Sequence, residues 1–204
     1  LIEQIYNGVD TDVFTLRDRQ ICRKKLGISA EYVMMGMAGK WLLEENKDVF
    51  DAVVQRLKDD ECLLLVGCTG EQKENLLAYP KTVPVGYIKD RKILSCYYNS
   101  ADAFVNLTFE DTLPTVNMEA VCCGTPVITY NSCGSPELVE EGKTGWIIPQ
   151  KDSQTLMSAW NSIKCGGIDR QICREIGLNR FNKEERYKDY IALFKRMVDT
   201  REEI

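Results

Sequence analysis

Short apolar runs that are rich in β-branched residues recur along the first three quarters of the chain. Most of them are unbroken rather than alternating, which is typical of strands that are buried on both faces of a parallel sheet. They predict six strands, at residues 32–38, 62–67, 82–86, 103–107, 126–130 and 146–148.

Segments with the spacing of helices lie between these runs. Apolar residues at 49–57 repeat as one core-facing helical stripe. Further helices are predicted at 71–79, 91–100, 114–123, 135–141, 152–164, 170–180 and 183–199. Pro114 and Pro136 each stand at an expected first helical position, where a missing N–H costs nothing. Asp152 is expected to cap the helix that follows it.

Strands that alternate with helices at this spacing predict an α/β fold, a Rossmann-like doubly wound parallel sheet with helices on both faces. After the last strand only helices follow, so the fold should end in a helical tail. Cys165-Gly166-Gly167 is interpreted as a turn between helices rather than a domain boundary. With 204 residues, the chain is expected to form one domain, 1–204, with a sizeable core.

Composition removes several classes of function. The chain has 26 Lys and Arg against 31 Asp and Glu, and this net charge of -5 argues against nucleic acid as a partner. It contains no histidine, which excludes His-based triads, His-ligated metal and a His general base within this chain.

Nine cysteines suggest a disulfide framework until their surroundings are considered. The number is odd, no Cys-x-x-Cys occurs, and Cys62, Cys122 and Cys123 lie in apolar runs. They predict reduced thiols that pack as small hydrophobes, as in a reducing cytosol. No apolar run approaches the ~20 residues of a membrane span, and no signal peptide is evident. Because the chain begins at Leu1, we expect a piece excised from a longer protein.

The ligand of an open parallel sheet binds outside the carboxyl ends of its strands. The loop after the first strand, residues 36–40, lacks the G-x-G-x-x-G spacing of a nicotinamide dinucleotide site. Lys40 and Lys47 follow that strand and could reach a diphosphate, although exposed lysines are more often only solvated.

The most informative stretch is FEDTLPTVNMEA at residues 109–120, directly after the fourth strand. A helix that begins at Pro114 leaves the amides of Thr115 and Val116 free to bind phosphate. Glu119 lies one turn further on the same face, and the carboxylates of Glu110 and Asp111 stand at the mouth of the loop. Carboxylates beside an anion site suit sugar hydroxyls. The alternative to a sugar-binding site is that the loop acid only caps the helix and that Glu119 is a solvated helix residue.

Asp10-Thr11-Asp12 has the D-x-D pattern that holds a divalent metal in many glycosyltransferases. Only two carboxylates converge, however, and Asn7-Gly8 precedes them as in a turn. The interpretation is a turn and no metal site.

Taken together, these residues resemble the C-terminal, donor-binding domain of GT-B fold retaining glycosyltransferases of family 4, the group 1 type that builds bacterial surface polysaccharides. YNGVDTDVF at 6–14 resembles the interdomain entry segment. GTPVI at 124–128, GSPE at 134–137 and GKTGW at 142–146 follow the acidic motif in the order typical of the family. The resemblance runs almost from end to end and implies one half of a GT-B fold.

The resemblance also implies roles for the acids. The family pairs two acids that are eight residues apart, and Glu119 fits the second, which holds the nucleotide ribose in relatives. Asp111 stands eight residues before it and Glu110 nine, so either is a candidate for the first acid, which contacts the donor sugar.

Relatives hold the diphosphate with an Arg and a Lys-Gly after the first strand. Lys47 resembles that lysine, but Asp48 replaces the glycine and no Arg occupies the expected place, for which Lys40 is the nearest substitute. Gly86, Tyr87 and Ile88 resemble the loop whose backbone contacts the nucleobase.

The activity implied is metal-independent hexosyl transfer from a nucleotide-diphosphate sugar, with retention and no cofactor, in surface or capsular polysaccharide synthesis. Lys40, Lys47 and the amides of Thr115 and Val116 would stabilise the leaving diphosphate. The acceptor-binding N-terminal domain is absent here, so the isolated domain should be inactive.

The implied partners are that N-terminal domain, the donor, and a sugar or lipid-linked acceptor. The expected location is cytoplasmic at the inner face of the membrane, with peripheral membrane contact through the absent half. Two alternatives stay open. One is a GT-B sugar-nucleotide epimerase or phosphorylase. The other is a non-catalytic nucleotide-sugar-binding subunit, which Asp48 and the missing Arg favour and the Glu119 region opposes.

Overall fold

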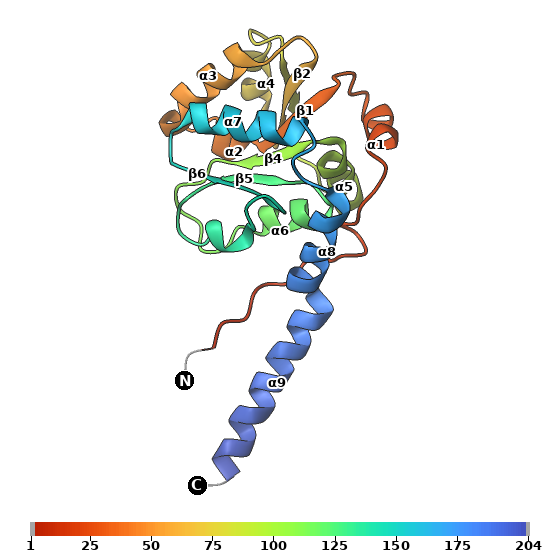
Figure 1. Ribbon diagram of the computed structural model, residues 1–204, viewed down its shortest axis with the longest axis vertical. Helices are drawn as coiled ribbons and strands as arrows, with labels where there is room; N and C mark the ends of the chain where they lie inside the picture. The colour runs from red at the N-terminus through yellow and green to blue at the C-terminus, as the bar shows by residue number, and fades with distance from the viewer. Residues whose placement is uncertain (1–2, 203–204) are drawn as a thin grey trace.

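The predicted apolar runs form one sheet in the computed structural model, which describes residues 3–202 (Figure 1). Its six strands all pair in parallel, in the order β3-β2-β1-β4-β5-β6. They are β1 (Tyr32–Met37), β2 (Glu61–Val66), β3 (Thr82–Val85), β4 (Ala103–Asn106), β5 (Val127–Tyr130) and β6 (Gly145–Ile148). Every residue of β2, β4 and β5 is buried, which explains why these strands lack alternation. The predicted parallel α/β fold is confirmed.

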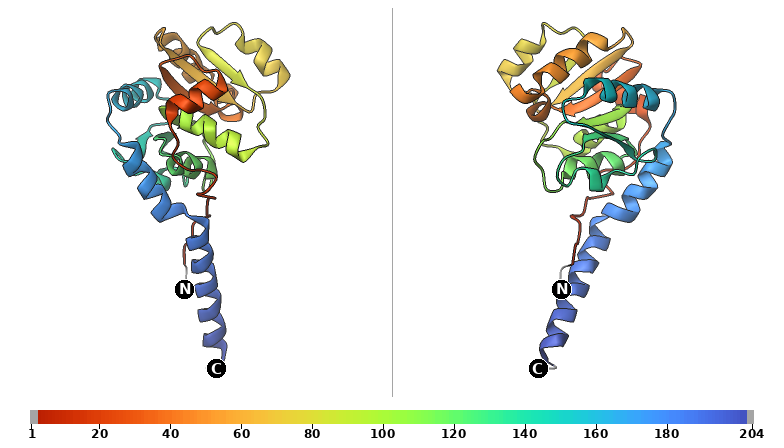
Figure 2. Two further views of the ribbon diagram at one scale, coloured as in Figure 1. Left: turned by 90° about the vertical axis from the view of Figure 1, so that its right-hand side faces the viewer. Right: turned by 60° about the vertical axis from the view of Figure 1, so that its left-hand side comes forward.

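Helices cover both faces of the sheet (Figures 1 and 2). On one face lie α3 (Lys47–Arg56), α4 (Gly70–Leu76) and α7 (Ser153–Lys164). On the other lie α1 (Arg19–Leu26), α5 (Arg91–Ser100), α6 (Thr115–Cys122) and α8 (Arg170–Phe181). A further helix of one turn, α2 (Ala38–Trp41), follows β1 directly. Alternation of strand and crossover helix brings the carboxyl ends of all six strands to one edge.

Side-chain caps fix where most of these helices begin. Four aspartates cap the helix that follows them through backbone amides of its first turn: Asp18 and Asp169 each accept one hydrogen bond, and Asp90 and Asp152 each accept two. Thr69 forms a reciprocal capping box at the start of α4. The predicted cap at Asp152 and the predicted bounds of α5 are therefore confirmed.

Three predicted details are wrong. The helix expected at 135–141 is a single 3₁₀ turn, Pro136–Leu138, because Val139 is extended and the Glu140 amide donates to Thr144 Oγ1. Pro114 caps α6 from an extended conformation instead of occupying its first turn. The helix expected at 71–79 ends at Leu76, whose carbonyl accepts from the Thr82 hydroxyl at 3.1 Å.

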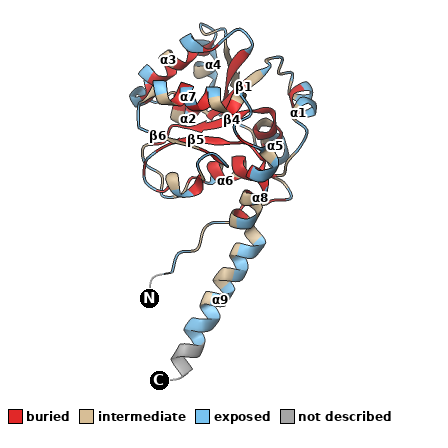
Figure 3. Ribbon diagram, in the orientation of Figure 1, coloured by how far each residue is buried: buried red, intermediate tan, exposed pale blue. Residues whose placement is uncertain are grey.

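The last described helix is α9 (Lys183–Glu202), which projects away from the rest of the fold (Figure 1). The N-terminal segment runs beside it, and Arg196 and Glu3 form an ion pair at 2.5 Å. Figure 3 shows that most of the described part of this helix is exposed. Five of its apolar side chains are among the exposed ones: Tyr187, Ile191, Phe194, Met197 and Val198. The helical tail was predicted. Among the described residues no helix has the length and hydropathy needed to cross a membrane.

The cysteines are packing residues, as the sequence predicts. All nine are free thiols, and only Cys133 and Cys165 are exposed. Burial raises the pKa of the Cys122 thiol to about 12 and likewise that of Cys123, so neither is a reactive thiolate at neutral pH.

Candidate functional site

A buried asparagine joins three loops at the carboxyl edge of the sheet. The Asn46 side-chain amide donates to the carbonyls of Lys40 and Leu107, each at 2.8 Å. Its Oδ1 accepts from the Tyr130 hydroxyl at 2.8 Å. Asn46 is fully buried, so these bonds hold the segments after β1, β4 and β5 together. The sequence analysis missed this residue, whose only sequence signal is an amide side chain just before a helix.

The two candidate lysines, Lys40 and Lys47, flank Asn46 in the sequence. Lys40 is half-buried in α2, and Lys47 is the exposed first residue of α3. Over residues 3–202, neither ammonium group has a carboxylate within ion-pair distance. Both positive charges are therefore available to an anion at this edge.

The two candidate carboxylates after β4 differ in their surroundings. Asp111 Oδ1 accepts the Leu113 amide of its own loop at 3.1 Å. Glu110 is exposed, and the Thr108 hydroxyl donates to its backbone carbonyl. A hydrogen bond therefore fixes one carboxylate oxygen of Asp111, whereas the contact at Glu110 involves only its backbone.

The first turn of α6 carries free amides, as the sequence predicts. Pro114 contributes no side-chain cap, and Thr115 is exposed. Directly beneath, Asn106 Nδ2 donates to Asn117 Oδ1 at 2.9 Å, both residues being buried. Asn106 Oδ1 and Asn117 Nδ2 have no partner in the described part of the chain. The start of α6 therefore combines free backbone amides with two buried side-chain amides that lack a second partner among the described residues.

Glu119 is not a solvated helix residue, so that alternative is wrong. Its side chain is 14% exposed and lies between two residues of α5. Oε2 accepts from the Tyr98 hydroxyl at 3.1 Å, and Oε1 lies 3.9 Å from Arg91 Nη2. Burial raises the pKa of Glu119, while the Tyr98 hydrogen bond and the Arg91 charge oppose that shift. Neither Tyr98 nor Arg91 was singled out from the sequence, since one helix pattern carries no information about its neighbour.

The loop after β3 is the remaining predicted contact surface. Gly86 and Ile88 are half-buried, and between them the Tyr87 side chain is 81% exposed. The Gly67 amide after β2 donates to the carbonyls of Val85 and Gly86, which fixes the start of this loop.

The Asp10-Thr11-Asp12 segment forms the predicted turn. Asp10 Oδ1 accepts from the amides of Asp12 and Val13, each at 3.2 Å. Its Oδ2 pairs with Lys183 Nζ at 2.8 Å, and that hydrogen bond lowers the pKa of Asp10. These contacts tie the entry segment to the start of α9.

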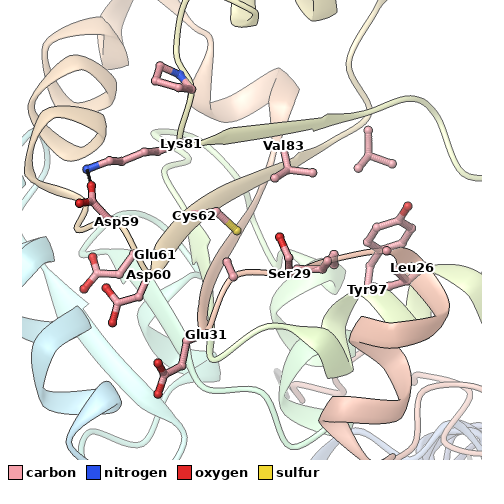
Figure 4. Close-up of a pocket in the computed structure, with 15 residues that line it drawn as sticks. Leu26, Ser29, Glu31, Asp59, Asp60, Glu61, Cys62, Lys81, Val83 and Tyr97 are labelled. Atoms are coloured by element: carbon pink, nitrogen blue, oxygen red, sulfur yellow. Dashed lines mark ion pairs between the residues drawn. The ribbon is translucent and has the colours of Figure 1, made fainter.

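The opposite, amino edge of the sheet holds a separate hollow of about 530 Å³ (Figure 4). Carboxylates of Glu31, Asp59 and Asp60 lie around it, and Lys81 pairs with Asp59 at 3.2 Å. None of the candidate site residues lines this hollow.

An all-parallel sheet of this strand order, with its polar groups gathered at the carboxyl edge, defines the class of Rossmann-like domains. Within that class, residues 32–163 match the family model described as "Glycosyl transferases group 1". The chain belongs to this family.

Individual relatives agree with this assignment. The D-inositol 3-phosphate glycosyltransferase of Mycobacteroides abscessus is 26% identical over 157 residues, covering 72% of this chain and 35% of that protein. A putative colanic acid biosynthesis glycosyltransferase, WcaL of Salmonella typhimurium, is 48% identical over 44 residues, covering 22% of this chain and 11% of that protein. The solved structure of HepE of Anabaena in complex with UDP has a TM-score of 0.80 at 20% identity.

The HepE match covers 95% of this chain but 57% of the solved chain. The chain thus spans between about a third and just over half of the relatives that it matches over most of its own length. The predicted fold, a Rossmann-like domain of the GT-B type, is confirmed, because the HepE structure matches 95% of this chain.

Proposed function

We propose that the chain is the donor-binding half of a retaining glycosyltransferase, which transfers a hexosyl group from a nucleotide-diphosphate sugar without a metal ion or cofactor. One observation carries the proposal: two lysines without a carboxylate partner among residues 3–202, free helix amides and three carboxylates all belong to the segments that follow β1 and β4, at the carboxyl edge of one parallel sheet. Cations and amides suit the diphosphate, and carboxylates suit hydroxyl groups.

The diphosphate is the group whose charge increases as the glycosidic bond breaks. Lys40 and Lys47 supply positive charge, and the amides of Thr115 and Val116 supply hydrogen bonds and the positive end of the α6 dipole. Because the Asn46 bonds fix the segment that carries both lysines, little reorganisation is needed when that charge develops.

The carboxylates bind hydroxyl groups of the donor. Glu119 receives the ribose, and the loop with Glu110 and Asp111 contacts the transferred sugar. Gly86, Tyr87 and Ile88 form the side of the site where the nucleobase binds. HepE, solved with UDP, makes a uridine nucleotide the first candidate.

The acceptor site belongs to a second half that lies outside these 204 residues. The coverage of HepE supports this, and so does the row of exposed apolar side chains on α9, which a second domain would cover. WcaL is named for colanic acid biosynthesis, which supports a role in surface or capsular polysaccharide synthesis. We place the protein in the cytoplasm at the inner face of the membrane, where a lipid-linked acceptor is accessible through that second half.

A second candidate is a non-catalytic nucleotide-sugar-binding subunit. Asp48 favours it, since this acidic residue follows Lys47 at the start of α3 and weakens the positive field there. Both candidates require the nucleotide to bind at the same edge and differ only in turnover.

Calorimetric titration of the chain with UDP, GDP, ADP and their glucose conjugates tests the shared requirement. One nucleotide series should bind, and Glu119→Ala should weaken it by ~1–3 kcal/mol. Glu74→Ala, an exposed glutamate of α4, is the matched control and should bind as the native chain does. Equal affinity for native chain and Glu119→Ala would remove Glu119 from the site, and no binding by any nucleotide would reject the proposal.

A further inference from the structure

We infer that Tyr98 and Arg91 are positioning residues for Glu119, and that together they orient its carboxylate toward the ribose 2′- and 3′-hydroxyls of the nucleotide. This rests on the function proposed above. Tyr98 and Arg91 act on Glu119 and do not contact the donor themselves. Both belong to α5, whereas Glu119 belongs to α6.

Tyr98 fixes one carboxylate oxygen. Its side chain is fully buried, and its ring lies edge-on against Phe14 at 6.0 Å and against Phe104 at 5.3 Å. The hydroxyl donates to Glu119 Oε2 at 3.1 Å. A buried hydroxyl without an acceptor is destabilising. Packing of the Tyr98 ring therefore fixes the position of its hydroxyl, and the hydrogen bond from that hydroxyl fixes Glu119 Oε2.

Arg91 acts on the other oxygen in a different way. Its Nη2 lies 3.9 Å from Oε1, which is beyond hydrogen-bond distance. The guanidinium stacks over the Phe14 ring at 5.1 Å, and the side chain is 56% exposed. Arg91 thus places a positive charge beside Oε1 and leaves the lone pairs of that oxygen free.

Both contacts favour the ionised form of a carboxylate whose burial favours the neutral one. Burial raises the pKa of Glu119, and the Tyr98 bond and the Arg91 charge act against that rise. An ionised carboxylate accepts about four hydrogen bonds, of which Tyr98 uses one. A vicinal diol presents two donors on adjacent carbons, so it matches a carboxylate that is fixed in orientation and still has free lone pairs.

The relative placement of the two helices is also fixed. The Thr125 hydroxyl, in the loop after α6, donates to the Tyr98 carbonyl at 2.7 Å. Asp90 caps the first turn of α5, where Arg91 is the first residue. Tyr98, Arg91 and Glu119 are therefore held on a rigid base, as a positioning role requires.

The test measures discrimination between ribose and deoxyribose. UDP and 2′-deoxy-UDP are titrated into the native chain and into Tyr98→Phe, Arg91→Ala and Glu119→Gln, with GDP and ADP pairs in parallel. Tyr97→Phe and Lys92→Ala are the matched controls, because they remove a hydroxyl and a charge from the same helix without touching Glu119. Circular dichroism confirms that each variant is folded.

The native chain should bind the ribonucleotide more tightly than its deoxy form. In Tyr98→Phe that ratio should fall by about tenfold, and in Arg91→Ala by about threefold, with Arg91→Lys restoring most of it. The two control variants should keep the native ratio. A merely structural role for Tyr98 would weaken both nucleotides equally and leave the ratio unchanged.

The outcomes separate the two proposals. If Glu119→Gln abolishes discrimination while Tyr98→Phe and Arg91→Ala retain it, the positioning inference is overturned and the donor site stands. Equal affinity for ribose and deoxyribose forms in the native chain would likewise overturn the inference. If none of the three nucleotides binds, the proposed function fails and the inference with it. Should Tyr98→Phe be unfolded, the exposed Arg91 variants decide the question.

Discussion

Gly134 and Thr112 lie in direct backbone contact across the carboxyl edge of the sheet. A Cβ atom on Gly134 would lie 1.7 Å from the Thr112 carbonyl oxygen. The Gly134 amide also donates to the Asp111 carbonyl at 3.2 Å. The loop after β5 therefore supports the loop that carries Glu110 and Asp111, and any side chain at position 134 must push the two loops apart.

Gly134→Ala should destabilise the fold and weaken nucleotide binding together. The obstacle is backbone rather than a flexible side chain, so relief requires the acidic loop to move, at ~1–3 kcal/mol. Thermal unfolding should shift by about 2–4 °C per kcal/mol for a chain of this length. Gly70→Ala is the control, because a Cβ there meets nothing within 4 Å. Native stability and affinity in Gly134→Ala would show that this contact does not support the site.

Glu119→Gln should stabilise the fold near neutral pH, because burial raises the pKa of Glu119. The folded state then holds the proton more tightly than the unfolded state does, so the native chain loses stability as pH rises from the unfolded value of about 4.3 through the raised one. Glutamine keeps an acceptor for Tyr98 and carries no charge. The facing groups are Tyr98 and Arg91 from α5, with the neutral thiols of Cys122 and Cys123 behind.

Urea unfolding of both chains between pH 4 and pH 8 measures this difference. The advantage of Glu119→Gln should appear as pH rises through that window and stay constant above it. Asp152→Asn should behave in the opposite way, since hydrogen bonds from Thr155 and Gln154 lower the pKa of Asp152 and stabilise its charged form. An advantage for Glu119→Gln that is equal at both ends of the range would contradict the argument.

Nucleotide binding should weaken as ionic strength rises. In the proposed complex, Lys40 and Lys47, which have no carboxylate partner among residues 3–202, would face the charged diphosphate, and exposed charges are screened beyond ~10 Å at 0.1 M salt. Lys47→Ala should lower the affinity for UDP by roughly three- to tenfold at low salt and flatten the salt dependence. Lys25→Ala, in the last turn of α1, should do neither. A salt dependence that is identical in Lys47→Ala and in the native chain would remove Lys47 from the site.

A chelator should leave nucleotide binding unchanged. The D-x-D pattern is the sequence feature that would have suggested a metal, and here the Asp10 carboxylate is used by two amides of its own turn and by Lys183. Titrations of UDP with EDTA, with added Mg²⁺ and with added Mn²⁺ check this. A large loss of affinity in EDTA that Mg²⁺ or Mn²⁺ restores would revive the metal hypothesis.

The periodicity predicted the sheet well because burial on both faces leaves an unbroken apolar run, and every predicted strand end lies within one residue of the structure. Helices with a capping side chain, such as α5, were also predictable. The expected helix at 135–141 failed because a tight turn into β6 decides the conformation there.

Only those site residues whose position follows from a local sequence pattern could be predicted. The free amides after Pro114 follow from one proline and one helix start, and the lysines from their place after a strand. Asn46 joins residues 61 and 84 positions away, and Tyr98 meets Glu119 from another helix. Such contacts depend on tertiary packing, which no local periodicity encodes.

The 204 residues alone should transfer no sugar at a useful rate. Holding donor and acceptor in reacting alignment contributes ~7–11 kcal/mol, and a donor half has no surface that aligns the acceptor. Without an opposing wall, water also reaches the diphosphate, so Lys47, Lys40 and the amides of α6 act in a higher dielectric and stabilise the leaving group less. The chain has no histidine that could act as a base for hydrolysis instead.

Release of nucleoside diphosphate from UDP-, GDP- and ADP-sugars measures this, first with the chain alone and then with the chain joined to an acceptor-binding half. The joined protein should release nucleoside diphosphate when a sugar or lipid-linked acceptor is present. The chain alone should bind the nucleotide sugar and release no nucleoside diphosphate from it. Replacing Ile191 and Phe194 of α9 by serine should lower turnover of the joined protein and leave nucleotide affinity of the chain alone unchanged, because both side chains are exposed and belong to the helix that projects away from the sheet (Figure 1). Comparable turnover by the chain alone would overturn the two-half architecture, since the donor site would then need no opposing domain to align the acceptor or exclude water.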